Sequence, residues 1–127
     1  SAMGLSVFPY IEFIISGRKK VVDFYNKKLS FSKYKTMKLR EGTCWNYSYY
    51  PIIFENEELL LKVQIEMNNN EIYPRRYFYP SLNKLKFIQA GEMPISESIA
   101  SRILCLPISL QIDENTLYKI CEIIDRN

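Results

Sequence analysis

The chain of 127 residues contains no histidine and very little glycine. Without histidine it cannot hold a histidine-dependent hydrolase triad, a histidine-ligated zinc ion or a histidine proton shuttle. The glycines at positions 4, 17, 42 and 91 are too far apart to form either the G-x-G-x-x-G dinucleotide pattern or the P-loop pattern. These absences exclude several common enzyme classes and leave the function open.

Cysteine is also scarce, with Cys44, Cys105 and Cys121 widely spaced. The spacing fits no C-x-x-C metal or redox motif, and an odd number cannot close a disulfide framework. We therefore expect free, buried thiols in a cytoplasmic protein, and no metal site. No run of 18 or more apolar residues is present, so no membrane span is predicted.

What is present indicates one globular domain. Hydrophobic residues make up 47% of the chain and charged residues 24%. A chain of this length buries roughly two-thirds of its unfolded surface, enough for a core without disulfides or metal. The start lacks the features of a signal peptide, and Ser1-Ala2 is interpreted as a cloning remnant before Met3. Residues 3–127 then form a single domain.

Positive charge is concentrated in the first third of the chain. Residues 1–40 contain nine Lys and Arg against two acids, whereas residues 41–127 contain eight against twelve, which gives the overall net charge of +3. Such a patch can bind nucleic acid or a membrane surface. More often a charge run is the solvated face of a helix and the loop that follows it.

Hydrophobic spacing predicts helices alternating with short strands. Helices are expected at Pro9–Leu29, where Gly17 weakens the helix, at Glu55–Asn69, at Ile95–Arg102 and after an Asp113 cap. Strands are expected at Trp45–Phe54, at Ile72–Tyr79 and at Ile103–Ile108. Ser30–Gly42 is expected to be an exposed connection with at most one short strand, and Ser81–Met93 a polar loop. Pro51 argues for an edge strand or a bulge.

This order predicts the α+β class, as a two-layer sandwich of a small, mostly antiparallel sheet with helices on one face. The other face of such a sheet needs water or a partner. Several large aromatic residues fall on the strand-like segments, and part of this surface is expected to contact something else. They are Trp45, Tyr47, Tyr49, Tyr50, Tyr77 and Tyr79.

The densest group of polar and aromatic residues is the segment Tyr73–Pro80, which contains the pair Arg75 and Arg76. Adjacent guanidinium groups among phenols suit phosphate or carboxylate recognition, because arginine offers a bidentate fork and tyrosine a hydroxyl donor. The alternative is an edge strand whose arginines face water and whose rings pack inward.

Three segments together resemble a known family. WNYSYYPIIF, then EIYPRRYFYPSLN, then PISESIASRILCLPIS with a closing helix, are similar to the C-terminal part of the DegT/DnrJ/StrS-type aminotransferases. These are pyridoxal-phosphate enzymes that aminate keto groups on nucleotide-linked sugars. The start, MGLSVFPYIEFIISGRKKVVDFYNKKL, is similar to the long helix that follows the family's catalytic domain, so the resemblance covers Met3–Asn127.

The resemblance implies the small C-terminal domain of a fold-type I aminotransferase. In the family, the preceding large domain carries the lysine that forms the imine with pyridoxal phosphate and the groups that hold the cofactor. None of the lysines in this chain has the glycine- and serine-rich surroundings of that lysine. We therefore expect no catalytic residue in this chain, no cofactor bound by it alone and no transaminase activity in isolation.

The resemblance also implies a substrate-binding region. Arg75, Arg76, Tyr77 and Tyr79 match a segment near the site for the nucleotide-linked sugar, and Asn46 and Tyr47 border it. Many relatives have a histidine in or near the position of Tyr77, which this chain lacks. One hypothesis assigns Arg76 to the substrate diphosphate.

Two alternatives remain. The chain can be a stand-alone module that binds anionic ligands or nucleic acid through its basic first third and its tyrosines. Nucleic acid is not expected, because these two features are separate in sequence and the RRM signature is absent. The chain can also be an interaction remnant, whose apolar surface, normally buried against a large domain, makes it self-associate as a homo-oligomer.

Overall fold

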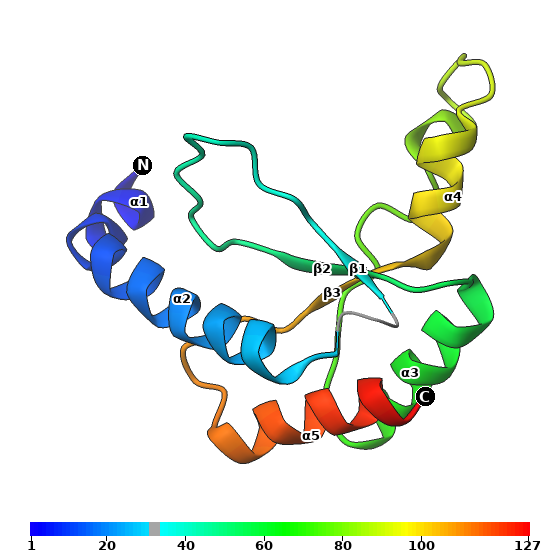
Figure 1. Cartoon of the computed structure of the whole chain (residues 1–127). Coiled ribbons are helices and arrows are strands. Elements are labelled where there is room, and N and C mark those ends of the chain that lie inside the picture. Colours follow the sequence, from blue (N-terminus) through cyan, green and yellow to red (C-terminus); the bar gives the residue numbers. More distant parts are fainter. Residues whose placement is uncertain (31–33) are drawn as a thin grey trace.

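A small antiparallel sheet lies at the centre of the molecule, whose computed structural model describes residues 1–30 and 34–127 (Figure 1). Within these residues the sheet has the strand order β1-β2-β3, with β1 at Lys35–Thr36, β2 at Tyr50–Ile53 and β3 at Ile103–Leu106. Ile52 of β2 pairs with Thr36 on one side and with Leu104 on the other. The middle strand therefore fixes the register of both neighbours.

Three helices form the second layer. α2 (Ile11–Lys28), α3 (Glu57–Asn69) and α5 (Glu114–Arg126) gather on the same side of the sheet, and α5 contacts the other two (Figure 1). α1 (Ala2–Val7) and the 3-10 turn Phe8–Tyr10 precede α2, and α4 (Pro94–Arg102) stands apart on the other side and runs directly into β3. The predicted α+β two-layer architecture is confirmed.

Side chains at the helix starts explain where α3 and α5 begin. Asn56 accepts a hydrogen bond from the backbone N–H of Leu59 at 2.8 Å, and Asp113 accepts one from Thr116 at 2.7 Å. Each satisfies a donor that has no partner within its helix. The Asp113 cap was predicted; α3 begins two residues later than predicted, at Glu57, because Asn56 caps it.

The core lies between the sheet and the helical layer. Tyr50 and Ile52 of β2 and Leu104 and Leu106 of β3 are buried, so Tyr50 belongs to the core instead of the outer aromatic surface. The helices contribute residues that are 0–2% exposed: Val22, Tyr25, Leu60, Val63, Met67, Ile120, Ile123 and Ile124. The Tyr25 hydroxyl donates to the Pro107 carbonyl at 2.9 Å, so its one polar atom is satisfied.

Gly17 has a packing role that the sequence did not indicate. A Cβ atom at this position would lie 1.8 Å from Cδ2 of Leu110. The absent side chain lets the segment after β3 pass close to α2.

Pro51 lies in the middle strand, so the edge-strand prediction was wrong. Pro51 pairs with Cys105 of β3, and the backbone N–H and C=O groups of Cys105 bond to Arg75 on the far side. The nitrogen of Pro51 therefore faces β1, and β1 ends at Thr36, opposite Ile52. The missing N–H falls just outside the ladder and costs no hydrogen bond.

The strands are shorter than predicted. Of Trp45–Phe54 only Tyr50–Ile53 is a strand, because Tyr47 has a left-handed backbone with φ of 52°. Of Ile72–Tyr79 only Arg75 makes a bridge, opposite Cys105. β3 ends at Leu106, before Pro107.

The remaining predictions concern the connections and the thiols. The short strand expected in Ser30–Gly42 is β1, and residues 31–33 of this segment lie outside the described residues. Ser81–Met93, expected to be a loop, contains a 3-10 turn at Leu82–Lys84. Cys105 and Cys121 are buried as expected, whereas Cys44 is exposed. Burial raises the pKa of the Cys105 and Cys121 thiols to about 11 each, so both are neutral at physiological pH.

Candidate functional site

The segment Tyr73–Pro80 runs along the outer edge of β3. Arg75 and Cys105 exchange both backbone hydrogen bonds, with N···O distances of 3.1 and 2.8 Å. Residues paired in this way share a face of the sheet, and neighbours along a strand point to opposite faces. Arg75 therefore lies on the face opposite the helical layer, and Arg76 turns toward α3.

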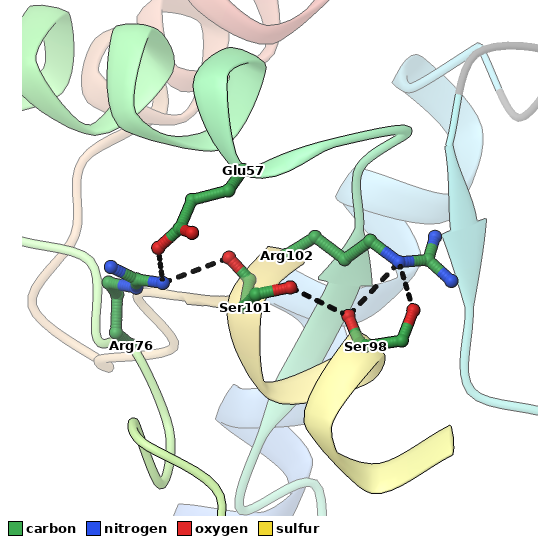
Figure 2. A network of polar contacts seen from close by, with 5 residues as sticks. All are labelled: Glu57, Arg76, Ser98, Ser101 and Arg102. Atoms are coloured by element: carbon green, nitrogen blue, oxygen red, sulfur yellow. Dashed lines mark hydrogen bonds and ion pairs between the residues drawn. The ribbon is translucent and has the colours of Figure 1, made fainter. Parts of the chain in front are cut away.

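Arg76 is an internal anchor, as Figure 2 shows. Its Nη2 lies 2.7 Å from Oε1 of Glu57 in the first turn of α3 and 2.9 Å from the carbonyl oxygen of Ser101 in α4. Its guanidinium carbon lies 3.6 Å from the centre of the Tyr79 ring. The arginine side chain is only 16% exposed. Arg76 thus joins α3, α4 and the Tyr73–Pro80 segment.

Arg102 fixes the same end of α4 from the other side. Its Nε donates to the Ser98 carbonyl at 3.1 Å, as Figure 2 shows. Its Nη1 donates to the Phe54 carbonyl at 3.0 Å. The backbone N–H of Phe54 donates in turn to the Arg102 carbonyl at 3.0 Å. The junction between α4 and β3 is therefore tied to the end of β2.

Tyr77 lies on the open face with other aromatic residues. Its ring centre is 4.6 Å from that of Tyr49 and 4.0 Å from that of Phe78. A hydrogen bond with the neighbouring Tyr49 phenol raises the pKa of the Tyr77 hydroxyl. Tyr79 is half exposed on the opposite side, over Arg76.

Asn46 and Tyr47 lie in the connection between β1 and β2. The side-chain oxygen of Asn46 accepts a hydrogen bond from the backbone N–H of Ser48 at 3.1 Å. The Tyr47 ring lies 4.6 Å from Trp45, and both rings pack against the core cluster. These interactions shape the connection and place the next two residues, Ser48 and Tyr49, beside β3.

A polar pocket of about 210 Å³ lies between α2, the β1–β2 connection, the Tyr73–Pro80 segment and the end of β3. Cys105 and Leu106 of β3 and the two residues after it, Pro107 and Ile108, line the pocket. Its walls carry five polar side chains: Arg18, Ser48, Tyr49, Tyr73 and Arg75. Of the predicted site residues only Arg75 lines this pocket. Tyr77 lines a second, more apolar pocket with residues of α4.

Sequence reasoning missed Arg18, Ser48, Tyr49 and Tyr73 as members of one site. Arg18 belongs to the basic first third, for which a solvated helix face was the more common interpretation. It is only partly exposed, however, and it lines the pocket with tyrosines that are 30 or more positions away in the chain. The only signal in the sequence was the coincidence of a basic helix with tyrosine-rich strands.

A sequence model of the DegT/DnrJ/EryC1/StrS aminotransferase family matches residues 1–125. The chain belongs to this family. It is 29% identical to the dTDP-4-amino-4,6-dideoxy-D-glucose transaminase of Escherichia coli and 28% identical to that of Shigella dysenteriae. Each match covers 98% of this chain and 36% of the relative. The chain thus spans about a third of the length of these sugar transaminases.

Solved aminotransferases share the fold. The aminotransferase TlmJ of Streptoalloteichus hindustanus superposes with a TM-score of 0.85 at 15% identity, covering 97% of this chain and 34% of TlmJ. A DegT DnrJ EryC1 StrS aminotransferase of Brucella abortus gives 0.79 at 24% identity, covering 96% of this chain and 33% of its own. Both matches confirm the predicted resemblance at the level of the fold.

The helices of residues 1–30 and 34–127 include none with the length and hydropathy of a membrane span.

Members of this family use pyridoxal phosphate, which needs a lysine amine for imine formation. Lys19 forms an ion pair with Asp23, Lys84 forms one with Glu97, and Lys28 lies over the Tyr118 ring. No lysine lines the two pockets above or a third one between Asn26, Met37 and Trp45.

Proposed function

We propose that this chain is the small C-terminal domain of a pyridoxal-phosphate-dependent nucleotide-sugar aminotransferase and that it does not transaminate alone. The match to the family over residues 1–125, at about a third of the length of the relatives, supports this proposal most directly. The lack of a lysine in the lining of the three pockets named above supports the second part.

The first experiment measures covalent cofactor capture. The chain is incubated with pyridoxal phosphate, reduced with borohydride and weighed by mass spectrometry, with peptide mapping. We expect no single lysine to carry a stoichiometric adduct, only sparse labelling spread over exposed lysines. A stoichiometric adduct on one lysine would overturn the proposal of inactivity.

The second experiment tests the domain assignment. The matching C-terminal third of the E. coli relative is replaced with this chain, and transamination of that enzyme's own substrate is measured. We expect activity above that of the truncated relative. A folded hybrid that binds pyridoxal phosphate but stays at the truncated level would contradict the assignment.

The predicted site residues enter the proposal in two groups. Arg75 and Tyr77, on the open face, are proposed to contact the nucleotide-linked sugar, and Asn46 and Tyr47 to border that site. Arg76 and Tyr79 are proposed to hold the segment in position, because the Arg76 guanidinium is engaged by Glu57, Ser101 and the Tyr79 ring.

The proposed location is the cytoplasm. The three cysteines are free. Two of them, Cys105 and Cys121, are buried, and burial raises the pKa of their thiols, so these thiols are neutral. Free thiols are typical of reducing compartments. Fractionation of the source cells with an antibody against the chain would test this location.

Self-association is a second candidate, favoured by the apolar N-terminal surface. Met3, Leu5, Phe8 and Phe13 are 68–80% exposed, and α1 has no buried residue. An apolar surface of this kind favours burial against another surface. We expect sedimentation velocity to show concentration-dependent association that the F8S/F13S variant reduces. A strict monomer at high concentration would exclude it.

A further inference from the structure

We propose that Arg18 and Arg75 together bind one oxyanionic group of a ligand, a phosphoryl or a carboxylate group, in the polar pocket at the end of β3. This proposal rests on the proposed function only for which ligand of the aminotransferase carries the anionic group. Anion binding itself is a property of this chain.

The electrostatics of the pocket favour an anion. Arg18 and Arg75 line the same cavity, and no acidic side chain lines it with them. Within the described residues neither guanidinium forms an ion pair, whereas Arg76 and Arg126 both do. Two guanidinium groups that line one cavity without an acidic partner give it a positive potential that attracts an anion.

The neighbouring polar groups complete an anion site. Ser48, Tyr49 and Tyr73, which carry hydroxyl groups, also line the pocket, and a hydroxyl donates to phosphate or carboxylate oxygen. Cys105 in the lining contributes no competing negative charge, because burial raises the pKa of its thiol to about 11. The site therefore combines positive charge, hydroxyl donors and a neutral thiol.

The size of the pocket limits what it encloses. At about 210 Å³ it is smaller than the roughly 300–1,000 Å³ of pockets that enclose a drug-sized ligand. It suits one charged group better than a whole nucleotide-linked sugar. Arg76 does not compete for this group, because its guanidinium is held on the other side of the segment by Glu57.

Two sources of the anion share this chemistry. One is the diphosphate of a nucleotide-linked sugar, and the other is a carboxylate of the amino donor. Inorganic phosphate and pyrophosphate represent the first source, and glutarate, a plain dicarboxylate, represents the second.

The experiment titrates the whole chain with each of these three probes at constant ionic strength, using calorimetry and amide chemical shifts. The variants are R18Q, R75Q and R18Q/R75Q. The matched control is R40Q, which removes an exposed arginine of the β1–β2 connection that lines none of the described pockets. Circular dichroism and urea unfolding verify that each variant folds.

We expect saturable binding of at least one probe by the wild-type chain. Each single variant should weaken it by on the order of tenfold, because a hydrogen bond to a charged group is lost, and the double variant should abolish it. R40Q should bind like the wild type. Tighter binding of pyrophosphate assigns the site to the substrate diphosphate, and tighter binding of glutarate assigns it to the amino donor.

Two results would overturn the proposal: no saturable binding of any probe, or equal binding by the wild type and the folded R18Q/R75Q variant. Failure of the proposed function looks different. An inactive hybrid with the E. coli relative, together with anion binding that R75Q weakens, would leave the anion site intact and refute the aminotransferase role.

Discussion

Arg76 and Glu57 form a partly buried ion pair, with 2.7 Å between Nη2 and Oε1, across the junction of the Tyr73–Pro80 segment and the first turn of α3. The same guanidinium reaches the carbonyl of Ser101 at the end of α4. One side chain thus holds three segments that are far apart in sequence. Replacement of the Arg76 side chain should therefore lower the stability of the fold more than it lowers ligand binding.

Replacement of Arg76 by Gln should lower the free energy of unfolding by about 2 kcal/mol. The cost lies below that of a fully buried pair because the Glu57 side chain is 38% exposed. Urea unfolding followed by circular dichroism measures it. R75Q is the matched control, and an exposed arginine without an ion pair should change stability by less than about 0.5 kcal/mol. Equal losses in R76Q and R75Q would contradict the anchoring role.

Leu60 and Leu61 are adjacent in α3 but differ in burial, at 0% and 40% exposed. Leu60→Ala should cost about 2–5 kcal/mol, because it removes buried contacts and leaves a cavity between α3, α5 and the sheet. Leu61→Ala should cost less than about 1 kcal/mol. Chemical denaturation of both variants checks this, and a larger loss in Leu61→Ala would show that the packing of α3 is wrong.

Glu97 should make stability depend on pH in the acidic range. Hydrogen bonds from the Met93 backbone N–H and from Asn83, with the Lys84 ion pair, lower the pKa of Glu97 from 4.5 to about 2. A lowered pKa in the folded state stabilises the protein above the ordinary pKa, and this stability is lost as the pH falls from about 4.5 to about 2.

Urea midpoints from pH 7 to pH 2 test this dependence in the wild type and in Glu97→Gln. The variant should be less stable at neutral pH, and the difference should shrink at the acidic end. Glu122→Gln, the same change at an exposed position of α5, should leave the pH profile unchanged. Parallel profiles for the wild type and Glu97→Gln would contradict the prediction.

Gly17 and Leu110 should be energetically coupled, because a Cβ atom at position 17 would lie 1.8 Å from Leu110 Cδ2. In an otherwise unhindered helix, Gly→Ala stabilises by up to about 1 kcal/mol. We expect this gain for G17A in the L110A background and not in the wild-type background. A double-mutant cycle measures the coupling, and additive effects would show that Leu110 turns aside freely.

Helices were predicted better than strands because their signals are local. The Asp113 side chain and the spacing of Leu117, Ile120 and Ile124 lie within one segment, and α5 forms there. The position of Pro51 depends instead on β1, which lies 15 or more residues earlier and ends opposite Ile52. Nothing in the sequence around Pro51 shows how long its partner strand is.

The candidate site was predictable only in part, for the same reason. The pair Arg75 and Arg76 stood out, but which of the two faces the open pocket depends on pairing with Cys105. Arg18 lines the pocket next to Gly17, where the chain after β3 passes close to α2. Such long-range placement is decided by packing and not by local pattern.

The backbone bridge between Arg75 and Cys105 separates the roles of two neighbouring arginines. Arg75 lines the pocket, and Arg76 binds Glu57 within the fold. Because side chains alternate along extended backbone, deletion of one residue between Ile72 and Arg75 would move Arg76 into the place of Arg75 and Tyr77 into the place of Arg76. Arg76 would then face the pocket, and Glu57 would lose its ion-pair partner. Length is therefore as strictly constrained in this segment as residue identity, and homologous segments should vary in composition before they vary in length.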